Sequence, residues 1–265
     1  MGAEHGDFGS TWKAPPRLVG PFWTGFGRGL LDFLLPPSSL DGDAALTGGL
    51  AAGAFSKVTF LDDPVCDGCG LGLAYAEAGH ERCPACQARP RAFQRARAAC
   101  VYDEHSRELI LKLKHADRTD LAGLFARWLS RAAVDLLDEA EAVVPVPVHR
   151  SRLLRRRYNQ AAEIARPLAR MAGLTYLPDA LVRRRDTASQ GGKSASGRRR
   201  NVAAAFAVPP SRRGLVEGRR IVLVDDVLTT GATAEGCARA LLAAGAASVS
   251  LSVVARVTEM QARPI

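Results

Sequence analysis

The sequence predicts an α/β fold, in which a parallel sheet is flanked by helices, together with a small cysteine-rich module ahead of it. Short apolar runs rich in β-branched residues recur between residues 98 and 255, and segments with helical apolar spacing separate them. Strands that alternate with helices in this way form a parallel sheet. Four of the six cysteines fall within residues 61–90, which predicts the separate small module.

The elements of the predicted sheet follow one another in a regular order. Four apolar runs are predicted strands, at 98–102, 142–148, 220–224 and 248–255. Four segments with helical spacing are predicted helices, at 107–115, 121–137, 152–172 and 233–244. Gly173 and Gly245 follow the last two helices, as glycine often does at a helix end. Residues 183–201 are polar and basic without an apolar stripe, so we expect a long mobile loop there.

Three parts are expected along the chain. Residues 1–60 are rich in Gly, Ala and Pro, which predicts irregular structure with at most a short helix at 27–35. Residues 61–95 form the cysteine module, and residues 96–265 form the α/β domain. No apolar run is long enough to span a bilayer, and the first residues lack the basic-then-apolar order of a secretory signal. We therefore expect a cytoplasmic protein without membrane insertion.

The positive charge of the chain is localised. The formal net charge is +9, yet residues 145–214 alone contain 16 Lys and Arg against 3 Asp and Glu. A localised basic field favours an anionic ligand, either a phosphate compound or a nucleic acid. A solvated basic surface with no ligand is the alternative that composition leaves open.

The cysteine spacing is typical of a structural zinc site. Cys66 and Cys69 form one CxxC pair, Cys83 and Cys86 form a second, and thirteen residues separate the pairs. Two such pairs complete a tetrahedral site with four thiolates, which leaves no open position for catalysis. Redox-active or unused cysteines are the alternative. His80 lies between the pairs and is interpreted as a surface residue, and Cys100 and Cys237 are interpreted as core residues.

An acidic pair and a threonine-rich turn follow the predicted strand at 220–224. Asp225 and Asp226 come first, and the segment 229–233, Thr-Thr-Gly-Ala-Thr, leads into a helix. Backbone N–H groups at such a turn and the helix N-terminus form an anion site at the carboxyl edge of a parallel sheet. Carboxylates beside a phosphate make sense if they bind sugar hydroxyls or a hydrated Mg²⁺. A plain helix N-cap is the alternative for the acidic pair alone.

The segment 225–233, with its acidic pair and Thr-rich turn, resembles the 5-phosphoribosyl-1-pyrophosphate (PRPP) motif of the type I phosphoribosyltransferases. Within them, the chain resembles the ComF (competence protein F) family most closely. The resemblance covers roughly residues 61–256 and implies the type I phosphoribosyltransferase fold with a flexible flap. Three further stretches carry it: Val144-Pro145-Val146-Pro147-Val148-His149-Arg150 followed by Arg157-Tyr158-Asn159-Gln160, Arg185-Asp186-Thr187-x2-Gln190, and Arg198-Arg199-Arg200-Asn201-Val202-x3-Phe206.

The resemblance implies roles for these positions. The residues implied to bind PRPP are Asp225, Asp226, Thr229, Thr230, Gly231, Ala232 and Thr233. Those implied to bind pyrophosphate are Pro147, Val148, His149 and Arg150. Those implied to lie in the flap are Arg185, Gln190, Lys193, Arg198, Arg200 and Asn201. The resemblance also implies Mg²⁺ bound with PRPP.

The chain departs from the family pattern in three places. Tyr158 replaces the usual Phe, and Lys193-Ser194 replaces an apolar-Ser pair. Many relatives have a further CxxC…CxxC knuckle near the N-terminus, where this chain keeps only the spacing, in Ser39-x2-Gly42 and Ala51-x2-Ala54. We interpret residues 1–60 as containing a degenerate zinc knuckle.

The expected activity is transfer of a phosphoribosyl group from PRPP to an unidentified nitrogen acceptor, with release of pyrophosphate. No residue stands out as a general base. The alternative is a non-catalytic protein that binds PRPP, or single-stranded DNA together with the competence machinery. Only Tyr158, Tyr176 and Phe206 are aromatic in the basic region, which favours phosphate neutralisation over base stacking. A purely structural zinc adaptor would leave the segment 225–233 unexplained.

Overall fold

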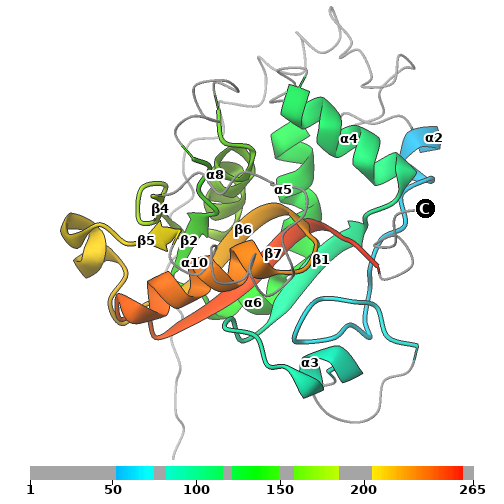
Figure 1. Ribbon diagram of the computed structural model, residues 1–265. Coiled ribbons are helices and arrows are strands. Elements are labelled where there is room, and N and C mark those ends of the chain that lie inside the picture. Colours follow the sequence, from blue (N-terminus) through cyan, green and yellow to red (C-terminus); the bar gives the residue numbers. More distant parts are fainter. Residues whose placement is uncertain (1–51, 75–81, 116–120, 150–157, 185–204, 259–265) are drawn as a thin grey trace, which may run out of the picture.

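The computed structural model describes residues 52–74, 82–115, 121–149, 158–184 and 205–258 (Figure 1). A five-stranded sheet in the order β1-β7-β6-β2-β3 lies at the centre, and each neighbouring pair in it is parallel. The parallel sheet confirms the predicted α/β class. Its strands are β1 (Ala96–Val101), β2 (Ala142–Pro145), β3 (Thr175–Tyr176), β6 (Arg220–Leu228) and β7 (Ser248–Arg256).

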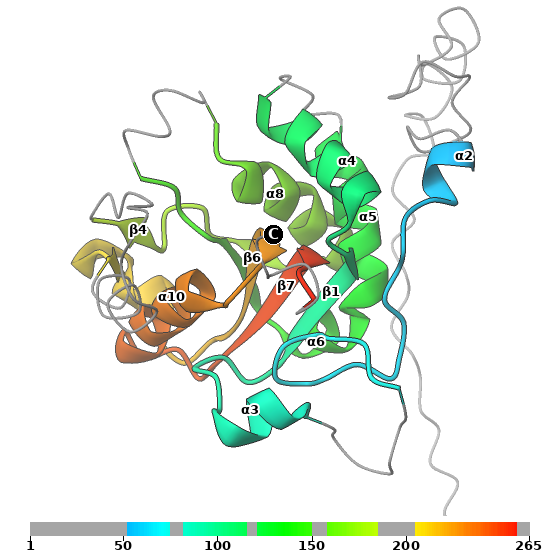
Figure 2. The same cartoon turned by 45° about the vertical axis from the view of Figure 1, so that its right-hand side comes forward.

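Helices cover both faces of this sheet, with α10 on one face and α4, α5 and α8 on the other (Figure 2). These helices are α4 (Glu104–His115), α5 (Leu121–Ala132), α8 (Gln160–Ala172) and α10 (Ala232–Ala243). Two apolar cores result, one between the sheet and α10 and one between the sheet and the α5–α8 layer.

The central position of β6 in the sheet explains why its sequence is apolar at successive positions. Ile221 and Leu223 join the core beneath α10, whereas Val222 and Val224 join the core beneath α5 and α8. Successive residues of a strand face opposite sides, so a strand that is covered on both sides needs apolar residues throughout. The alternation shifts after Val224, since Val227 packs against the core beneath α5 and α8 and Leu228 joins the core beneath α10.

The connections of the sheet change direction between β2 and β6. From β2 the chain runs through α8 to the edge strand β3, whereas from β6 it runs through α10 to β7 on the other side. Pro145 pairs with Val224, and the Val146 N–H donates to the Val224 carbonyl at 2.9 Å. Ligands of open α/β sheets bind at such a switch point, outside the carboxyl ends of the strands.

Several shorter elements surround the sheet. β4 and β5 form a small antiparallel hairpin close to α10, and Arg183 lies over the Phe206 ring at 5.4 Å. The long loop predicted from residue 183 therefore begins within a strand. The shorter elements are α2 (Ala52–Phe55), α3 (Pro84–Ala88), α6 (Val134–Glu139), β4 (Val182–Arg183), β5 (Phe206–Ala207) and the 3-10 helix η1 (Pro210–Leu215).

Several predicted boundaries are wrong. The helix predicted at 121–137 is two helices, because Ala133 leaves the helical backbone region (φ −121°, ψ 27°) between α5 and α6. The helix predicted at 152–172 has its N-cap at Asn159, whose backbone is extended (φ −105°, ψ 112°), and residues 152–157 lie outside the described ranges. β2 ends at Pro145 instead of residue 148, since Pro147 has no N–H to donate.

The segment just before the cysteine module pairs with the outer edge of β1. Phe60 forms an antiparallel bridge with Cys100, the Leu61 N–H donates to the Ala99 carbonyl at 3.0 Å, and the Val101 N–H donates to the Thr59 carbonyl at 2.8 Å. This pairing was not predicted. Cys100 and Cys237 are fully buried, as predicted for core residues.

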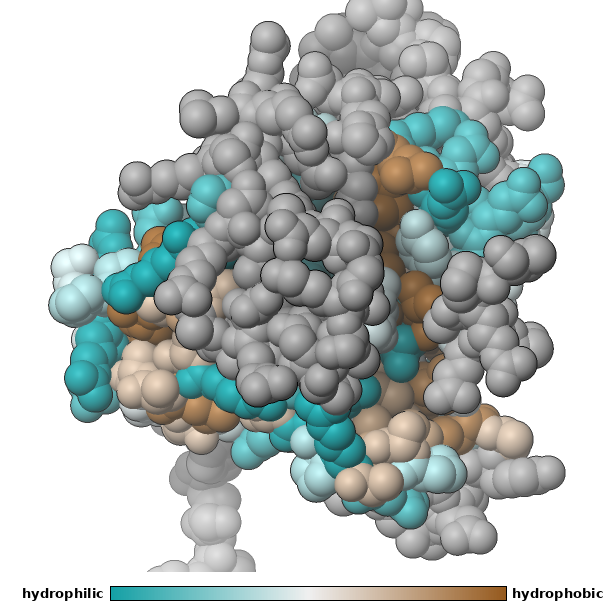
Figure 3. Space-filling view, viewed as in Figure 1, coloured by the Kyte–Doolittle hydropathy of each residue, from teal (hydrophilic) through white to brown (hydrophobic). Residues whose placement is uncertain are grey.

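Where described residues are visible on the viewed face, hydrophobic side chains lie among hydrophilic ones (Figure 3). Within the described ranges, every helix is too short or too polar to cross a lipid bilayer. The predicted short helix at 27–35 and His80 lie outside those ranges. Of the residues of the degenerate knuckle, Ser39, Gly42 and Ala51 lie outside them as well, whereas Ala54 is in α2.

Candidate functional site

The four cysteines of the predicted zinc site come together. All four sulfurs lie within 4.8 Å of one another, and no cysteine of the set is more than 7% exposed. The Sγ atoms of Cys69 and Cys83 are 3.8 Å apart, and the Cys83 N–H donates to the Cys66 sulfur at 3.1 Å. Four convergent, buried sulfurs fit a tetrahedral Zn²⁺ site.

Each CxxC pair is a tight turn held by its own backbone. The N–H groups of Cys69 and Gly70 donate to the Cys66 carbonyl at 3.2 and 2.7 Å, and the Cys86 N–H donates to the Cys83 carbonyl at 2.9 Å. Gly68 lies where the two turns meet, because a Cβ there would be 2.7 Å from the Cβ of Cys86. The turns therefore present their sulfurs to a common centre.

The thiols of this cluster differ in acidity. A hydrogen bond from Cys69 lowers the pKa of Cys66 to about 4, although burial opposes the shift. The same bond, followed by burial, raises the pKa of Cys69, and burial raises the pKa of Cys86. These shifts favour the thiolate form of Cys66 next to the protonated thiol of Cys69. A bound Zn²⁺ would displace the remaining protons, since metal ligands must be thiolates.

The acidic pair lies within β6, which continues to Leu228 beyond the predicted end at residue 224. Asp225 and Asp226 are half-buried, and the Asp226 N–H donates to Asp225 Oδ1 at 2.9 Å. Two adjacent half-buried carboxylates offer acceptors to hydrogen-bond donors at the carboxyl end of the strand. A sugar hydroxyl and the water shell of Mg²⁺ are such donors.

The threonine-rich turn forms the N-terminus of α10. Gly231 is the N-cap residue and has φ 83°, a conformation that favours glycine. Thr229 and Thr230 are exposed, whereas Ala232 and Thr233 are half-buried. Exposed hydroxyls beside a helix N-terminus suit a phosphate group.

The loop after β2 lies beside this turn, since β2 and β6 are neighbours in the sheet. Pro147 is buried, and Val148 and His149 are half-buried. Asn159 Nδ2 donates to the Val146 carbonyl at 3.0 Å and so ties the loop to the start of α8. The predicted residues outside the described ranges are Arg150 of this loop and the flap residues Arg185, Gln190, Lys193, Arg198, Arg200 and Asn201.

Charged residues that sequence reasoning missed surround the turn. Glu235 is only 4% exposed and binds Arg91 at 2.9 Å, Arg89 at 3.5 Å and Arg239 at 2.6 Å. Arg91 also donates to the Thr230 carbonyl at 2.9 Å. Arg256 donates to the carbonyls of Leu228, Thr229 and Cys69 at 3.3, 3.1 and 3.1 Å. The CxxC…CxxC spacing is the only nearby signal in the sequence, and it does not point to these arginines.

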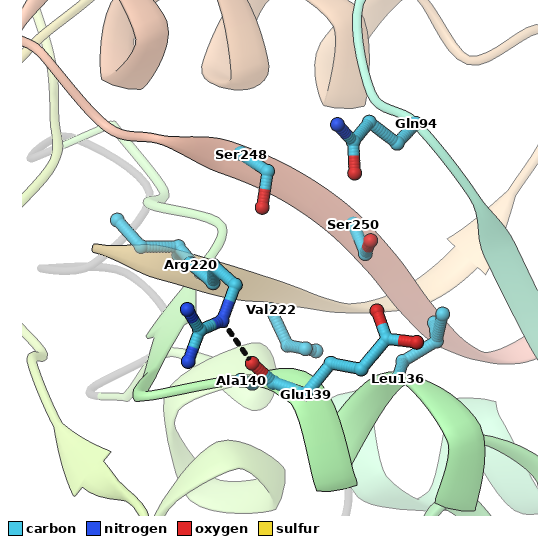
Figure 4. Close-up of a pocket in the computed structure, with 9 residues that line it drawn as sticks. Gln94, Leu136, Glu139, Ala140, Arg220, Val222, Ser248 and Ser250 are labelled. Atoms are coloured by element: carbon cyan, nitrogen blue, oxygen red, sulfur yellow. Dashed lines mark hydrogen bonds between the residues drawn. The ribbon is translucent and has the colours of Figure 1, made fainter. Parts of the chain in front are cut away.

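A separate small hollow lies at the amino ends of the strands, opposite the carboxyl ends where the candidate site lies (Figure 4). Arg220 and Ser248 begin β6 and β7 there, and Arg220 Nε donates to the Glu139 carbonyl. The amino ends of the strands are far along the sheet from Asp225 and Asp226, so this hollow is not part of the candidate site. Its lining includes Gln94, Leu136, Glu139, Ala140, Arg220, Val222, Ser248 and Ser250.

The switch point between β2 and β6, with its acidic pair and threonine turn, defines the type I phosphoribosyltransferase fold. Residues 159–264 match the phosphoribosyl transferase domain family. Over 206 residues the chain is 32% identical to the DNA utilization protein YhgH of Escherichia coli, covering 76% of this chain and 88% of the relative. Over 213 residues it is 30% identical to Competence protein F of Haemophilus influenzae, covering 78% and 90%. The chain belongs to the competence protein F family.

Among solved structures, the chain is similar to the glutamine phosphoribosylpyrophosphate amidotransferase from B. subtilis complexed with ADP and GMP. The identity is 26% and the TM-score is 0.34. The match covers 52% of this chain and 26% of that structure, so the chain spans about a quarter of its length.

Proposed function

We propose that this protein binds PRPP with Mg²⁺ at the carboxyl ends of β2 and β6 and transfers the phosphoribosyl group to a nitrogen acceptor, releasing pyrophosphate. The observation that carries the proposal is the position of the loop at 146–149 beside Asp225 and Asp226, fixed by the pairing of Pro145 with Val224. The match to the phosphoribosyl transferase domain family supports it.

Each part of the site has a role that suits its chemistry. The carboxylates of Asp225 and Asp226 accept hydrogen bonds from ribose hydroxyls and favour positive charge developing at C1. Thr229, Thr230 and Thr233, with the turn N–H groups, hold the 5′-phosphate, and residues 147–150 hold pyrophosphate. Bound Mg²⁺ would neutralise the departing pyrophosphate.

Calorimetry with PRPP and Mg²⁺ tests the binding site. We expect Asp225→Asn and Asp226→Asn each to lose on the order of 1.5–3 kcal/mol of binding free energy, because an anionic acceptor becomes neutral. Asp138→Asn is the matched control, since Asp138 is exposed on α6 and away from the site. Unchanged PRPP affinity in the folded double variant would refute the site, and a screen for pyrophosphate release across nitrogen acceptors tests the transfer.

We further propose that residues 61–95 form a module with one structural Zn²⁺ at Cys66, Cys69, Cys83 and Cys86, and that residues 96–265 form the phosphoribosyltransferase domain. Four thiolate ligands require a reducing compartment, which suits the cytoplasm. Metal analysis of the purified protein should find about one equivalent of zinc.

A second proposal, suggested by the names of the relatives, is contact with single-stranded DNA. The aromatic residues of the basic region are engaged within the fold. The Tyr158 hydroxyl donates to the Leu113 carbonyl, Tyr176 donates to the Ala162 carbonyl at 3.1 Å, and Phe206 is buried beneath Arg183. Binding would therefore be to phosphates, and its affinity should fall steeply with salt in an anisotropy titration. Salt-independent binding would contradict this view.

A further inference from the structure

The phosphate turn needs partners for its own carbonyl groups. A trans peptide directs the carbonyl of one residue and the N–H of the next to opposite sides. A turn that offers its N–H groups to an anion must therefore direct its carbonyls into the protein, where they require donors. In this protein guanidinium groups donate to the Thr229 and Thr230 carbonyls, and the Leu228 carbonyl accepts from the Val257 N–H at 3.0 Å as well as from a guanidinium at 3.3 Å.

Both guanidinium groups are also attached to the cysteine cluster. Arg256 Nη1 holds the carbonyls of Leu228 and Thr229, while its Nε donates to the Cys69 carbonyl at 3.1 Å. Arg91 holds the Thr230 carbonyl at 2.9 Å and lies close enough to Cys86 for its positive charge to interact with the sulfur. One arginine thus links the turn to the first CxxC pair and the other links it to the second.

The position of Arg91 is fixed from two further sides. Its Nη1 binds Oε1 of the buried Glu235 at 2.9 Å, in the first turn of α10. The turn also packs closely on Arg91, since a Cβ on Gly231 would lie 3.0 Å from Nη1. A carboxylate near a helix N-terminus would repel an anion there, but Arg89, Arg91 and Arg239 surround this one and make the local charge positive.

We infer that the cysteine cluster is a positioning element of the phosphate turn, and that Arg91 and Arg256 transmit its geometry to the carbonyls of Leu228, Thr229 and Thr230. Zn²⁺ bound by the four sulfurs would fix the two CxxC turns relative to each other, and with them the Cys86 sulfur and the Cys69 carbonyl that anchor the arginines. Loss of the metal frees these anchors and loosens the turn. As far as it concerns PRPP, the inference rests on the proposed function.

Hydrogen exchange at the amides of Glu235 and Val257, which donate to the Gly231 and Leu228 carbonyls of the turn at 2.8 and 3.0 Å, tests the inference without any ligand. The proteins compared are zinc-loaded wild type, metal-stripped wild type, Arg91→Ala and Arg256→Ala. Arg95→Ala is the matched control, because Arg95 binds Asp135 and Glu139 and no carbonyl of the turn. We expect these amides to exchange about tenfold faster in the stripped protein and in both turn variants, and at the wild-type rate in Arg95→Ala.

Calorimetry with PRPP and Mg²⁺ is the second measurement, and we expect about tenfold weaker binding in the same three proteins. If truncation to Ala unfolds the chain, Arg91→Lys and Arg256→Lys take the place of the Ala variants, because Lys keeps the charge without the planar fork. The PRPP affinity of these Lys variants should then be lower than that of wild type. If zinc-loaded wild type binds no PRPP, the proposed function fails, yet the exchange result still decides the inference. Unchanged exchange in folded, zinc-retaining variants of Arg91 and Arg256 would overturn it.

Discussion

Gly68 is the residue on which the closure of the cysteine cluster depends most directly. A Cβ at this position would lie 2.7 Å from the Cβ and 2.9 Å from the Sγ of Cys86. We expect Gly68→Ala to push the two CxxC turns apart and to reduce bound zinc well below one equivalent, measured by metal analysis. Gly214→Ala is the control, since a Cβ there has no neighbour within 4 Å. Full zinc content in Gly68→Ala would show that the turns can separate without losing the site.

Residue identity predicted the cluster of four cysteines but not the groups around the threonine-rich turn. The CxxC pairs are visible because four ligands of one chemical type recur at a fixed spacing. Glu235 and Arg91 are 144 positions apart, and an acidic residue in the first turn of a helix is common in any case. Only the folded chain shows that this glutamate is buried among three arginines.

At the scale of elements, α8 depends on Asn159 in two ways. Its side-chain oxygen accepts from the Ala161 N–H at 3.2 Å, and its Nδ2 donates to the Val146 carbonyl at 3.0 Å. Asn159→Ala loses both bonds and should cost about 1 kcal/mol of unfolding free energy, measured by denaturant titration. In Asn159→Ser the hydroxyl can still cap the helix, but it is too short to reach the Val146 carbonyl. This variant should therefore regain the stability lost in Asn159→Ala, while both variants bind PRPP more weakly than wild type. Equal PRPP affinity in both variants and wild type would argue against a role for the 146–149 loop.

Element types were easier to predict than element ends. The apolar runs at 220–224 and 248–255 predict buried strands because both faces of β6 and β7 are covered. The end of β6 was misplaced because Asp225 and Asp226 look like a strand terminus, although Asp225 still pairs with Val253 of β7. The start of α8 was misplaced because arginines are good helix formers, so the run before Asn159 has no visible break.

At the scale of the whole molecule, burial of the Cys100 thiol makes the free energy of unfolding depend on pH in the alkaline range. Burial, and to a smaller extent the Asp103 carboxylate, raises the pKa of Cys100 from 9.0 to about 12. Between these values the unfolded chain loses a proton that the folded chain keeps, so stability falls as pH rises through this range and is unaffected below it. The loss should approach about 1.4 kcal/mol per pH unit.

Denaturant unfolding of wild type and Cys100→Ala from pH 8 upward measures this contribution. The variant is expected to be less stable at pH 8, because a buried side chain is removed, but to lose less stability with rising pH. Parallel pH profiles for the two proteins would show that Cys100 ionises as easily in the folded chain as in the unfolded one.

The pairing of residues 59–61 with β1 also affects how the protein behaves among copies of itself. An open strand edge is a template onto which another chain can add, and such addition leads to aggregation. The β1 edge is already paired through Thr59, Phe60 and Leu61, and at the other edge β3 is only two residues long. Both ends of the sheet are thereby protected, and the segment before the first cysteine contributes to keeping the protein in solution as well as to its fold.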